Sequence, residues 1–191
     1  MGRLAAIVVA GGGSRRFGSD KLDLRGDDGR TLLATTVAGA AAIADPVIVV
    51  GPQRELGSPV LSALEDPPGG GPCAALVAGL ALVPADCALV AVLAGDAPNG
   101  ALAVPALTRV IDDAAAATVT DSAGREQPLT ALYSVQPLRE ALATLGDPAD
   151  RSVREVLDAL RPHTVVSIID AWGACDDIDV REDAERLGYR T

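Results

Sequence analysis

The chain has 191 residues, 49% of them hydrophobic, and a formal net charge of −10. This length suits one domain over residues 1–191, with enough aliphatic side chains for a sizeable core. The acidic charge argues against a nucleic-acid-binding protein, which usually carries a basic face. His163 is the only histidine, which argues against a histidine metal site. No apolar run is long enough to cross a bilayer, and the first, Leu4–Ala10, ends in glycines rather than in a signal-peptide pattern. We therefore expect a cytoplasmic protein that binds neither nucleic acid nor membrane.

Strands and helices alternate through the first two-thirds of the chain, which favours an α/β fold with a parallel sheet covered by helices. The strands expected at 4–10, 47–50 and 88–93 are aliphatic runs typical of a buried strand. In such sheets ligands bind beyond the carboxyl ends of the strands, so the loops 11–21 and 95–98 are the places to search. The expected elements in chain order are strand 4–10, helix 31–43, strands 47–50 and 60–64, helix 73–82, strand 88–93, helix 102–113, strands 116–120 and 129–134, helices 136–145 and 152–160, strand 164–168 and helix 181–187.

The loop after the first strand combines three glycines with three cations. Glycines allow backbone amides to approach phosphate oxygens, and the cations add positive charge in an otherwise acidic protein. The P-loop pattern fails because Ser19 stands where its lysine would be, and the dinucleotide pattern fails because Arg16 replaces its last glycine. The loop therefore predicts a polyphosphate site of another kind. Its residues are Gly11, Gly12, Gly13, Arg15, Arg16 and Lys21.

This loop resembles the L-A-G-G-x-S-x-R-M-G-x-D-K signature of the molybdenum cofactor nucleotidyltransferases, the MobA-like NTP transferase family. It departs at Val9 and Phe17, both apolar replacements. The resemblance implies a Rossmann-like three-layer nucleotidyltransferase fold with a mostly parallel sheet. The matching residues are Ala10, Gly11, Gly12, Ser14, Arg16, Gly18, Asp20 and Lys21.

A second candidate group is acidic. Asp96 directly follows the strand 88–93, where a carboxylate could bind Mg²⁺ as a hard oxygen ligand or could cap the next helix. Position alone does not decide between these roles, but Asp96-Ala97-Pro98 matches the Asp-x-Pro of the family, which implies the Mg²⁺ ligand. The tail residues Asp177 and Asp179 resemble a family segment that supports the metal, although a helix N-cap explains Asp179 equally well.

Two further segments resemble the family less closely. Asp66 and Gly71 match an acidic residue and a glycine that line the nucleotide pocket, with Asp66 near the base or ribose, whereas the prolines between them indicate a rigid loop. Arg151 and Arg154 match a basic segment that faces the acceptor, and a solvated helix face is an equal alternative.

The implied reaction is attack of the terminal phosphate of molybdopterin on the α-phosphorus of GTP, with release of pyrophosphate. Arg16, Lys21 and Asp96 are the expected catalytic residues, with Asp96 holding Mg²⁺. Product transfer would involve transient contact with molybdoenzyme apoproteins or chaperones. The expected nucleotide-binding residues are Ala10, Gly11, Gly12, Gly13, Lys21, Asp66, Gly71 and Asp96.

Three alternatives stay open: a CTP-dependent molybdopterin cytidylyltransferase, a sugar-phosphate nucleotidyltransferase, and a non-catalytic nucleotide-binding partner. Gly11 favours GTP, because the cytidylyltransferases tend to carry a second alanine there. The tail 177–179 leans towards the cytidylyltransferase pattern.

Overall fold

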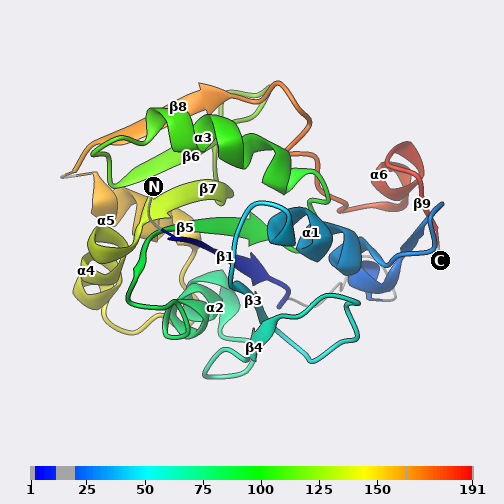
Figure 1. Cartoon of the computed structure of the whole chain (residues 1–191), viewed down its shortest axis with the longest axis horizontal. Helices are drawn as coiled ribbons and strands as arrows, with labels where there is room; N and C mark the ends of the chain where they lie inside the picture. Colours follow the sequence, from blue (N-terminus) through cyan, green and yellow to red (C-terminus); the bar gives the residue numbers. More distant parts are fainter. Residues whose placement is uncertain (1–2, 12–19, 162, 191) are drawn as a thin grey trace.

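The computed structural model describes residues 3–11, 20–161 and 163–190. Within them, seven strands form one sheet with the order β4-β3-β1-β5-β7-β6-β8. A separate antiparallel pair joins β2 (Arg25–Gly26) to β9 (Tyr189–Arg190). Figure 1 shows the sheet crossing the molecule beneath α1 and α3. The strands of the large sheet are β1 (Arg3–Val9), β3 (Val47–Val50), β4 (Leu61–Ala63), β5 (Cys87–Ala94), β6 (Ala116–Thr120), β7 (Glu126–Ser134) and β8 (Val165–Ile169).

The sheet is mostly parallel, as predicted. β1 pairs in parallel with β3 and β5, β3 with β4, and β6 with β8, whereas β7 runs antiparallel to both of its neighbours. The carboxyl ends of β1, β3, β4 and β5 therefore meet at one edge. Four loops, which begin after Val9, Val50, Ala63 and Ala94, leave the sheet together at that edge.

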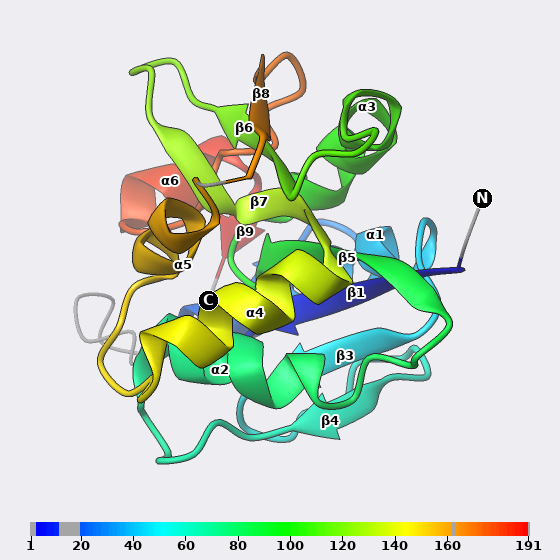
Figure 2. The same ribbon diagram turned by 90° about the vertical axis from the view of Figure 1, so that its left-hand side faces the viewer.

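Helices cover both faces of the sheet, which confirms the three-layer α/β architecture. α1 (Leu32–Ala41) and α3 (Val104–Val110) pack on one face, and α2 (Gly71–Leu80), α4 (Val135–Leu145) and α5 (Val153–Leu160) pack on the other, as Figure 2 shows. β1 supplies both cores: Ala6 and Val8 face α1, while Ile7 faces α2. Burial on both faces explains why the central strands β1, β3 and β5 read as almost unbroken aliphatic runs.

The largest difference from the predicted helices lies in the expected helix 102–113. The expected helix 102–113 is divided into a 3₁₀ turn, η2 (Gly100–Ala103), and α3, with Pro105 in the first turn of α3. Proline suits a first turn because it lacks the N–H that this turn leaves unpaired. The predicted N-cap of α1 is confirmed, since Thr31 Oγ1 accepts a hydrogen bond from the Ala34 N–H at 3.2 Å.

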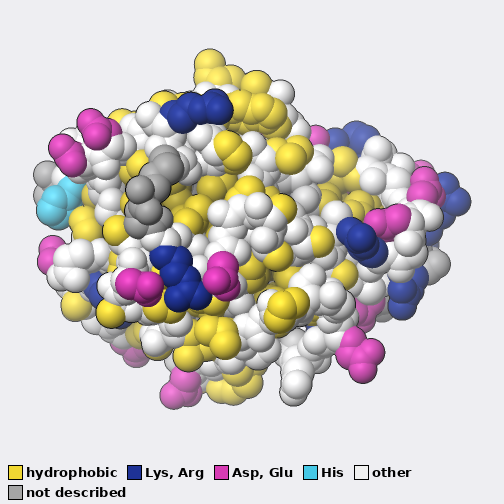
Figure 3. Space-filling view, viewed as in Figure 1, with side chains coloured by type: hydrophobic (Ala, Val, Ile, Leu, Met, Phe, Trp, Pro, Cys, Tyr) yellow, Lys and Arg dark blue, Asp and Glu magenta, His cyan; other side chains and the backbone are white. Residues whose placement is uncertain are grey.

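Three short elements were not predicted: η1 (Lys21–Asp23), β2 and β9. They span two or three residues each, which is too short for a hydrophobic period. The helix α6 (Arg181–Arg186) lies beside β9 (Figure 1). None of the described helices is long and apolar enough to cross a membrane. The face seen in Figure 3 has a centre of apolar and uncharged atoms, with charged side chains of both signs around it.

Candidate active site

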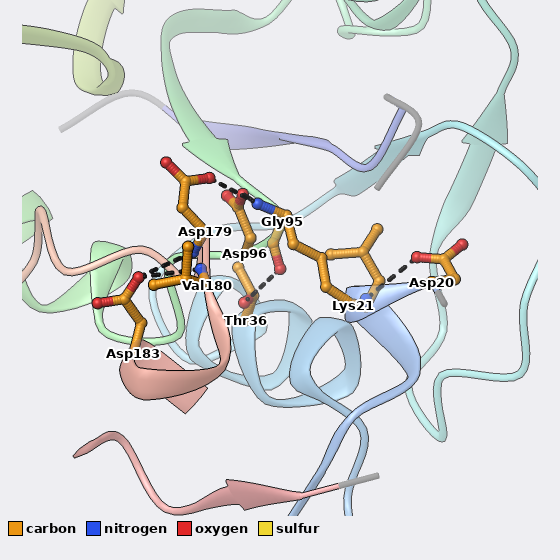
Figure 4. A network of polar contacts seen from close by, with 9 residues as sticks. Asp20, Lys21, Thr36, Gly95, Asp96, Asp179, Val180 and Asp183 are labelled. Atoms are coloured by element: carbon orange, nitrogen blue, oxygen red, sulfur yellow. Dashed lines mark hydrogen bonds and ion pairs between the residues drawn. The ribbon is translucent and has the colours of Figure 1, made fainter. Parts of the chain in front are cut away.

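One lysine and three aspartates gather at the sheet edge where β5 ends. Lys21 Nζ lies 2.6 Å from Asp96 Oδ2 and 3.0 Å from Asp179 Oδ1. Asp177 completes the cluster, since carboxylate oxygens of Asp96, Asp177 and Asp179 all lie within 4.8 Å of one another. Figure 4 shows Lys21 reaching across from η1 to the carboxylates of Asp96 and Asp179. The structure thus brings together Lys21 and Asp96, which the sequence predicted, with both tail aspartates.

Asp96 is held by the backbone around it. Gly95 N–H donates to Val9 O at 2.9 Å, which ties the end of β5 to the end of β1. On the other side, the buried Thr36 hydroxyl donates to Gly95 O at 3.0 Å, as Figure 4 shows. A Cβ at Gly95 would stand 3.0 Å from Val9 O and 3.2 Å from Leu33 Cδ1, so this close approach favours glycine. Asp96 is therefore fixed between β1 and α1.

The tail is anchored beside Asp96 by an apolar residue. Ile178 is fully buried, and its N–H donates to Asp96 O at 3.3 Å. Because Ile178 is buried, its two neighbours, Asp177 and Asp179, are held at the site. The N-cap interpretation of Asp179 is wrong: Val180 is the N-cap residue of α6, and Asp183 Oδ2 accepts the Asp179 and Val180 N–H groups at 3.2 and 3.1 Å (Figure 4).

The donor set suits a hard divalent cation such as Mg²⁺, which prefers carboxylate oxygens. Burial lowers the pKa of Lys21, but the nearby charges of Asp96 and Asp179 outweigh burial, and the pKa is raised overall. Partial desolvation, followed by the charges of Asp179 and Asp96, raises the pKa of Asp177. Both shifts include the effect of neighbouring carboxylates, which attract the ammonium group of Lys21 and repel the carboxylate of Asp177. A divalent cation would relieve that repulsion, so the residues present fit such an ion.

The position of Lys21 depends on an arginine that sequence reasoning missed. Asp20 caps η1 by accepting the Leu22 N–H at 3.1 Å, and Arg54 forms ion pairs with Asp20 and with Asp23 on the two sides of Lys21. Arg54 lies in the loop after β3, with its side chain only 16% exposed. Its place after an aliphatic strand was the one available signal. Arg54 therefore braces the turn that carries Lys21.

The residues expected to bind the nucleotide differ in how far they are buried. Ala10 is buried, and its N–H donates to Val50 O at 2.8 Å. Gly11 stands next to the buried carboxyl of Glu65, a residue that sequence reasoning missed, whereas Asp66 is exposed. Gly71 opens α2, with φ +88°.

Some predicted residues cannot be placed at the site. Gly12, Gly13 and Arg16 lie outside the described residues. Arg151 forms an ion pair with Glu155 at 3.0 Å, and Arg154 donates to the backbone of Glu126 at 2.9 Å. Both arginines thus contact other residues of the protein, Arg154 on α5 and Arg151 in the loop before it.

Comparison with known proteins identifies a family that matches most of the chain. The family model described as the MobA-like NTP transferase domain matches residues 6–165. A protein of Chloroflexus aggregans named "Probable molybdenum cofactor guanylyltransferase" is 33% identical over 153 residues, which cover 73% of this chain and 71% of that protein.

Solved structures show the same fold. Molybdopterin-guanine dinucleotide biosynthesis protein A from Archaeoglobus fulgidus aligns with a TM-score of 0.70 at 16% identity, over 96% of both chains. A Mycobacterium tuberculosis protein, Rv0371C, solved as a complex with manganese, aligns with a TM-score of 0.70 at 20% identity, over 98% of both chains. The family model covers most of the chain, and the sheet edge carries the lysine and carboxylates described above. The chain belongs to the MobA-like NTP transferase family.

Proposed function

We propose that this protein transfers GMP from GTP to the terminal phosphate of molybdopterin and releases pyrophosphate. The observation that carries the proposal is the cluster of Lys21, Asp96, Asp177 and Asp179 at the carboxyl edge of the sheet. The name of the Chloroflexus aggregans relative supports the choice of GTP and of the molybdenum cofactor.

The reaction needs little covalent help from the protein. An oxygen of the molybdopterin phosphate forms a bond to the α-phosphorus of GTP, the bond to the bridging oxygen breaks, and pyrophosphate leaves with the electron pair. Positioning and neutralisation of charge supply most of the catalysis in such transfers. This fits a cluster of Lys21, Asp96, Asp177 and Asp179, which contains no serine, cysteine or histidine.

We assign Asp96 as the principal ligand of a bound Mg²⁺, with Asp177 and Asp179 supporting it. Mg²⁺ in this position would act as a Lewis acid on the phosphate oxygens and would orient the triphosphate. Because three carboxylates would repel a triphosphate that arrives alone, we expect nucleotide and metal to bind together.

Lys21 is assigned the role of neutralising negative charge on the triphosphate. Its ammonium group stands among the carboxylates that would hold the metal, so phosphate oxygens that approach the metal also approach Lys21. Interaction with negative charge that grows on the leaving pyrophosphate would stabilise the transition state. Arg16 is proposed to assist Lys21, and the amides of Gly12 and Gly13 to contact the phosphates, on the basis of the signature alone.

We also propose that residues 1–191 act as one domain. The family model ends at residue 165, yet Asp177 and Asp179 from the following segment lie against Asp96 and Lys21. The site would be incomplete without the tail. Product transfer by transient contact with molybdoenzyme apoproteins or chaperones is part of the same proposal.

The proposal is tested by measuring thermal shifts with each of the four NTPs, with and without Mg²⁺, and then pyrophosphate release with molybdopterin present. We expect GTP with Mg²⁺ to give the largest shift, and pyrophosphate release to require both GTP and molybdopterin. A larger shift with CTP would replace the guanylyl assignment by a cytidylyl one. Failure of every NTP to bind in the presence of Mg²⁺ would overturn the nucleotidyltransferase proposal.

A further inference from the structure

The strand β8 leaves one edge of the large sheet unpaired. β8 is the last strand in the sheet order and pairs in parallel with β6. Among residues 3–11, 20–161 and 163–190, no strand pairs with its outer edge. Figure 1 shows β8 along the upper rim of the molecule, and apolar side chains gather along the same rim in Figure 3. Such an edge offers backbone donors and acceptors to another strand.

The hydrogen bonds to β6 show which backbone groups of β8 face outwards. Thr164 O accepts the Ala115 N–H at 2.8 Å, and the Asp170 N–H donates to Thr120 O at 3.0 Å. Successive residues of a strand direct their backbone groups to opposite sides, so every second residue between these two contacts faces away from β6. The outward-facing residues of β8 are Val165, Ser167 and Ile169.

β8 lacks the features by which edge strands usually avoid pairing. Such strands commonly carry a lysine, a proline, an inward-pointing charge or a β-bulge. The sequence of β8, VVSII, contains no charged residue and no proline, and its register with β6 is uninterrupted. Ile169 is 79% exposed, more than any other large hydrophobic residue in the described part of the chain. The edge is therefore suited to pairing with a further strand.

We propose that β8 is a dimerisation edge, which pairs antiparallel with β8 of a second copy of this chain about a two-fold axis between the two Ser167 residues. In this arrangement Ser167 lies opposite Ser167 of the second copy, and Val165 lies opposite Ile169 of the second copy. All these residues direct their backbone groups outwards, so each pair exchanges two N–H···O hydrogen bonds. The pairing uses every outward-facing backbone group of the strand and makes the two sheets continuous.

The side chains of β8 support a second copy as the partner. Val165 packs against the core on the α5 side of the sheet, whereas Val166 and Ile168 pack against the core on the α3 side. Because side chains alternate along a strand, Ile169 lies on the same face as Val165. In the dimer, the exposed Ile169 of each copy packs beside Val165 of the other. Cross-strand pairs of β-branched residues stabilise a sheet.

The two-fold arrangement also separates like charges, which matters for a chain with a net charge of −10. Asp170 directly follows β8. Antiparallel pairing about Ser167 places Asp170 opposite Thr164 of the second copy, so the two Asp170 residues lie at opposite ends of the paired strands. A parallel pair in register would bring them together, and like charges directly opposite each other destabilise a sheet. Two-fold dimers are also the commonest homo-oligomers.

Sedimentation velocity over a series of protein concentrations tests the proposal. Wild-type protein should show a monomer–dimer equilibrium with the dimer as its largest species. Ser167→Pro removes the outward-facing N–H at the centre of the paired strands and keeps the bonds to β6, because proline is tolerated on an edge strand where the N–H faces solvent. Each dimer loses two hydrogen bonds, so its dissociation constant should rise about ten- to a hundredfold.

Two control variants should dimerise as wild-type protein does. Ser62→Pro makes the same change on β4, the opposite edge strand. Ala63 O accepts the Gly51 N–H at 3.0 Å, so the neighbouring Ser62 directs its own N–H away from β3. Ser167→Ala removes the hydroxyl group, which contacts the Thr120 hydroxyl, and keeps the outward-facing N–H.

Ile169→Lys probes the same edge through a side chain. The substitution should leave the fold of one chain intact because Ile169 is exposed, and it places a lysine against Val165 of the second copy. Lysine is a common protection of natural edge strands, and the dissociation constant of the dimer should rise about tenfold.

Wild-type protein that stays monomeric up to about 100 μM would overturn the proposal and would leave the edge to another protein or to none. A dimer that both Ser167→Pro and Ile169→Lys leave unchanged, or that Ser62→Pro weakens as much as Ser167→Pro does, would overturn it as well. If circular dichroism shows that Ser167→Pro does not fold, Ile169→Lys decides alone.

Discussion

Thr36→Val tests whether α1 positions the metal-binding aspartate. Thr36 is 1% exposed, and its hydroxyl lies 3.0 Å from Gly95 O and 3.2 Å from Leu32 O. Leu32 O also belongs to the helix hydrogen-bond ladder, whereas the contact with Gly95 joins two separate elements. Valine has nearly the same shape and lacks the hydroxyl, so it removes the link to Gly95 without opening a cavity.

Thr36→Val should lower the stability of the protein, because Gly95 O loses the hydrogen bond from the Thr36 hydroxyl. A buried carbonyl without a partner costs about 1–3 kcal/mol. For a chain of this length each kcal/mol lowers Tm by about 2–4 °C, so the variant should melt roughly 2–12 °C lower. Asp96 is the next residue in the chain, and small displacements of a reacting group cost about ten- to a hundredfold in rate. The Mg²⁺ concentration for half-maximal turnover should also rise, which a purely structural role would not produce.

Thr35→Val is the control for this prediction. Thr35 is the neighbouring residue on α1, and its hydroxyl donates only within the helix, to Thr31 O at 3.2 Å. This variant should keep wild-type turnover and Mg²⁺ dependence. The assays are thermal unfolding and pyrophosphate release over a series of Mg²⁺ concentrations. If Thr36→Val showed the same Mg²⁺ dependence as Thr35→Val, the positioning role would be refuted.

Four other changes give distinct outcomes. Asp96→Asn should fold normally and lose about a hundredfold or more of its turnover, because it removes a charge from the metal at constant volume; wild-type pyrophosphate release would contradict the assignment. Arg54→Ala should weaken GTP binding about tenfold, because the turn that carries Lys21 loses its ion pairs, and an unchanged dissociation constant would show that the brace is dispensable. Gly11→Ala should reduce use of GTP more than use of CTP, because the added methyl group would take room that the larger purine needs against the backbone; equal losses in competition assays would count against this. Hydrogen bonds lower the pKa of Asp121 to about 2, and the backbone N–H of Arg125 has the largest effect. Asp121 therefore stabilises the fold above about pH 4 and loses this effect as the pH falls towards 2, so the Tm difference between wild type and Asp121→Asn should shrink over that range and should not stay constant.

The sequence predicted the elements that follow a hydrophobic period. The aliphatic run at Val47–Val50 became a strand with the expected bounds, because a strand that is buried on both faces carries apolar side chains throughout. By contrast, β2 and β9 pair two residues each across most of the chain length. No local pattern can predict such a pairing, since it depends on where the folded tail arrives.

The residues of the site also fall into two groups, those that the sequence predicted and those that only the folded structure shows. Lys21 and Asp96 were predicted because each directly follows a pattern that is visible in the sequence, a glycine-rich loop or an aliphatic strand. Glu65 and Arg54 were missed because each is a single charged residue in a loop, and only the folded structure shows that Glu65 is buried and Arg54 mostly covered. The choice between the two roles of Asp179 also required the fold, because the burial of Ile178 fixes where its neighbours point.

The most direct test of the proposed reaction follows the phosphorus atoms of GTP. Wild-type protein would be incubated with molybdopterin, Mg²⁺ and GTP labelled either at the α- or at the γ-phosphorus, and the products separated by chromatography. A nucleotidyltransferase should place the α-label in the molybdopterin product and the γ-label in pyrophosphate, in equal amounts. Appearance of the γ-label in the acceptor or in inorganic phosphate, with the α-label retained in GDP, would contradict the proposed chemistry.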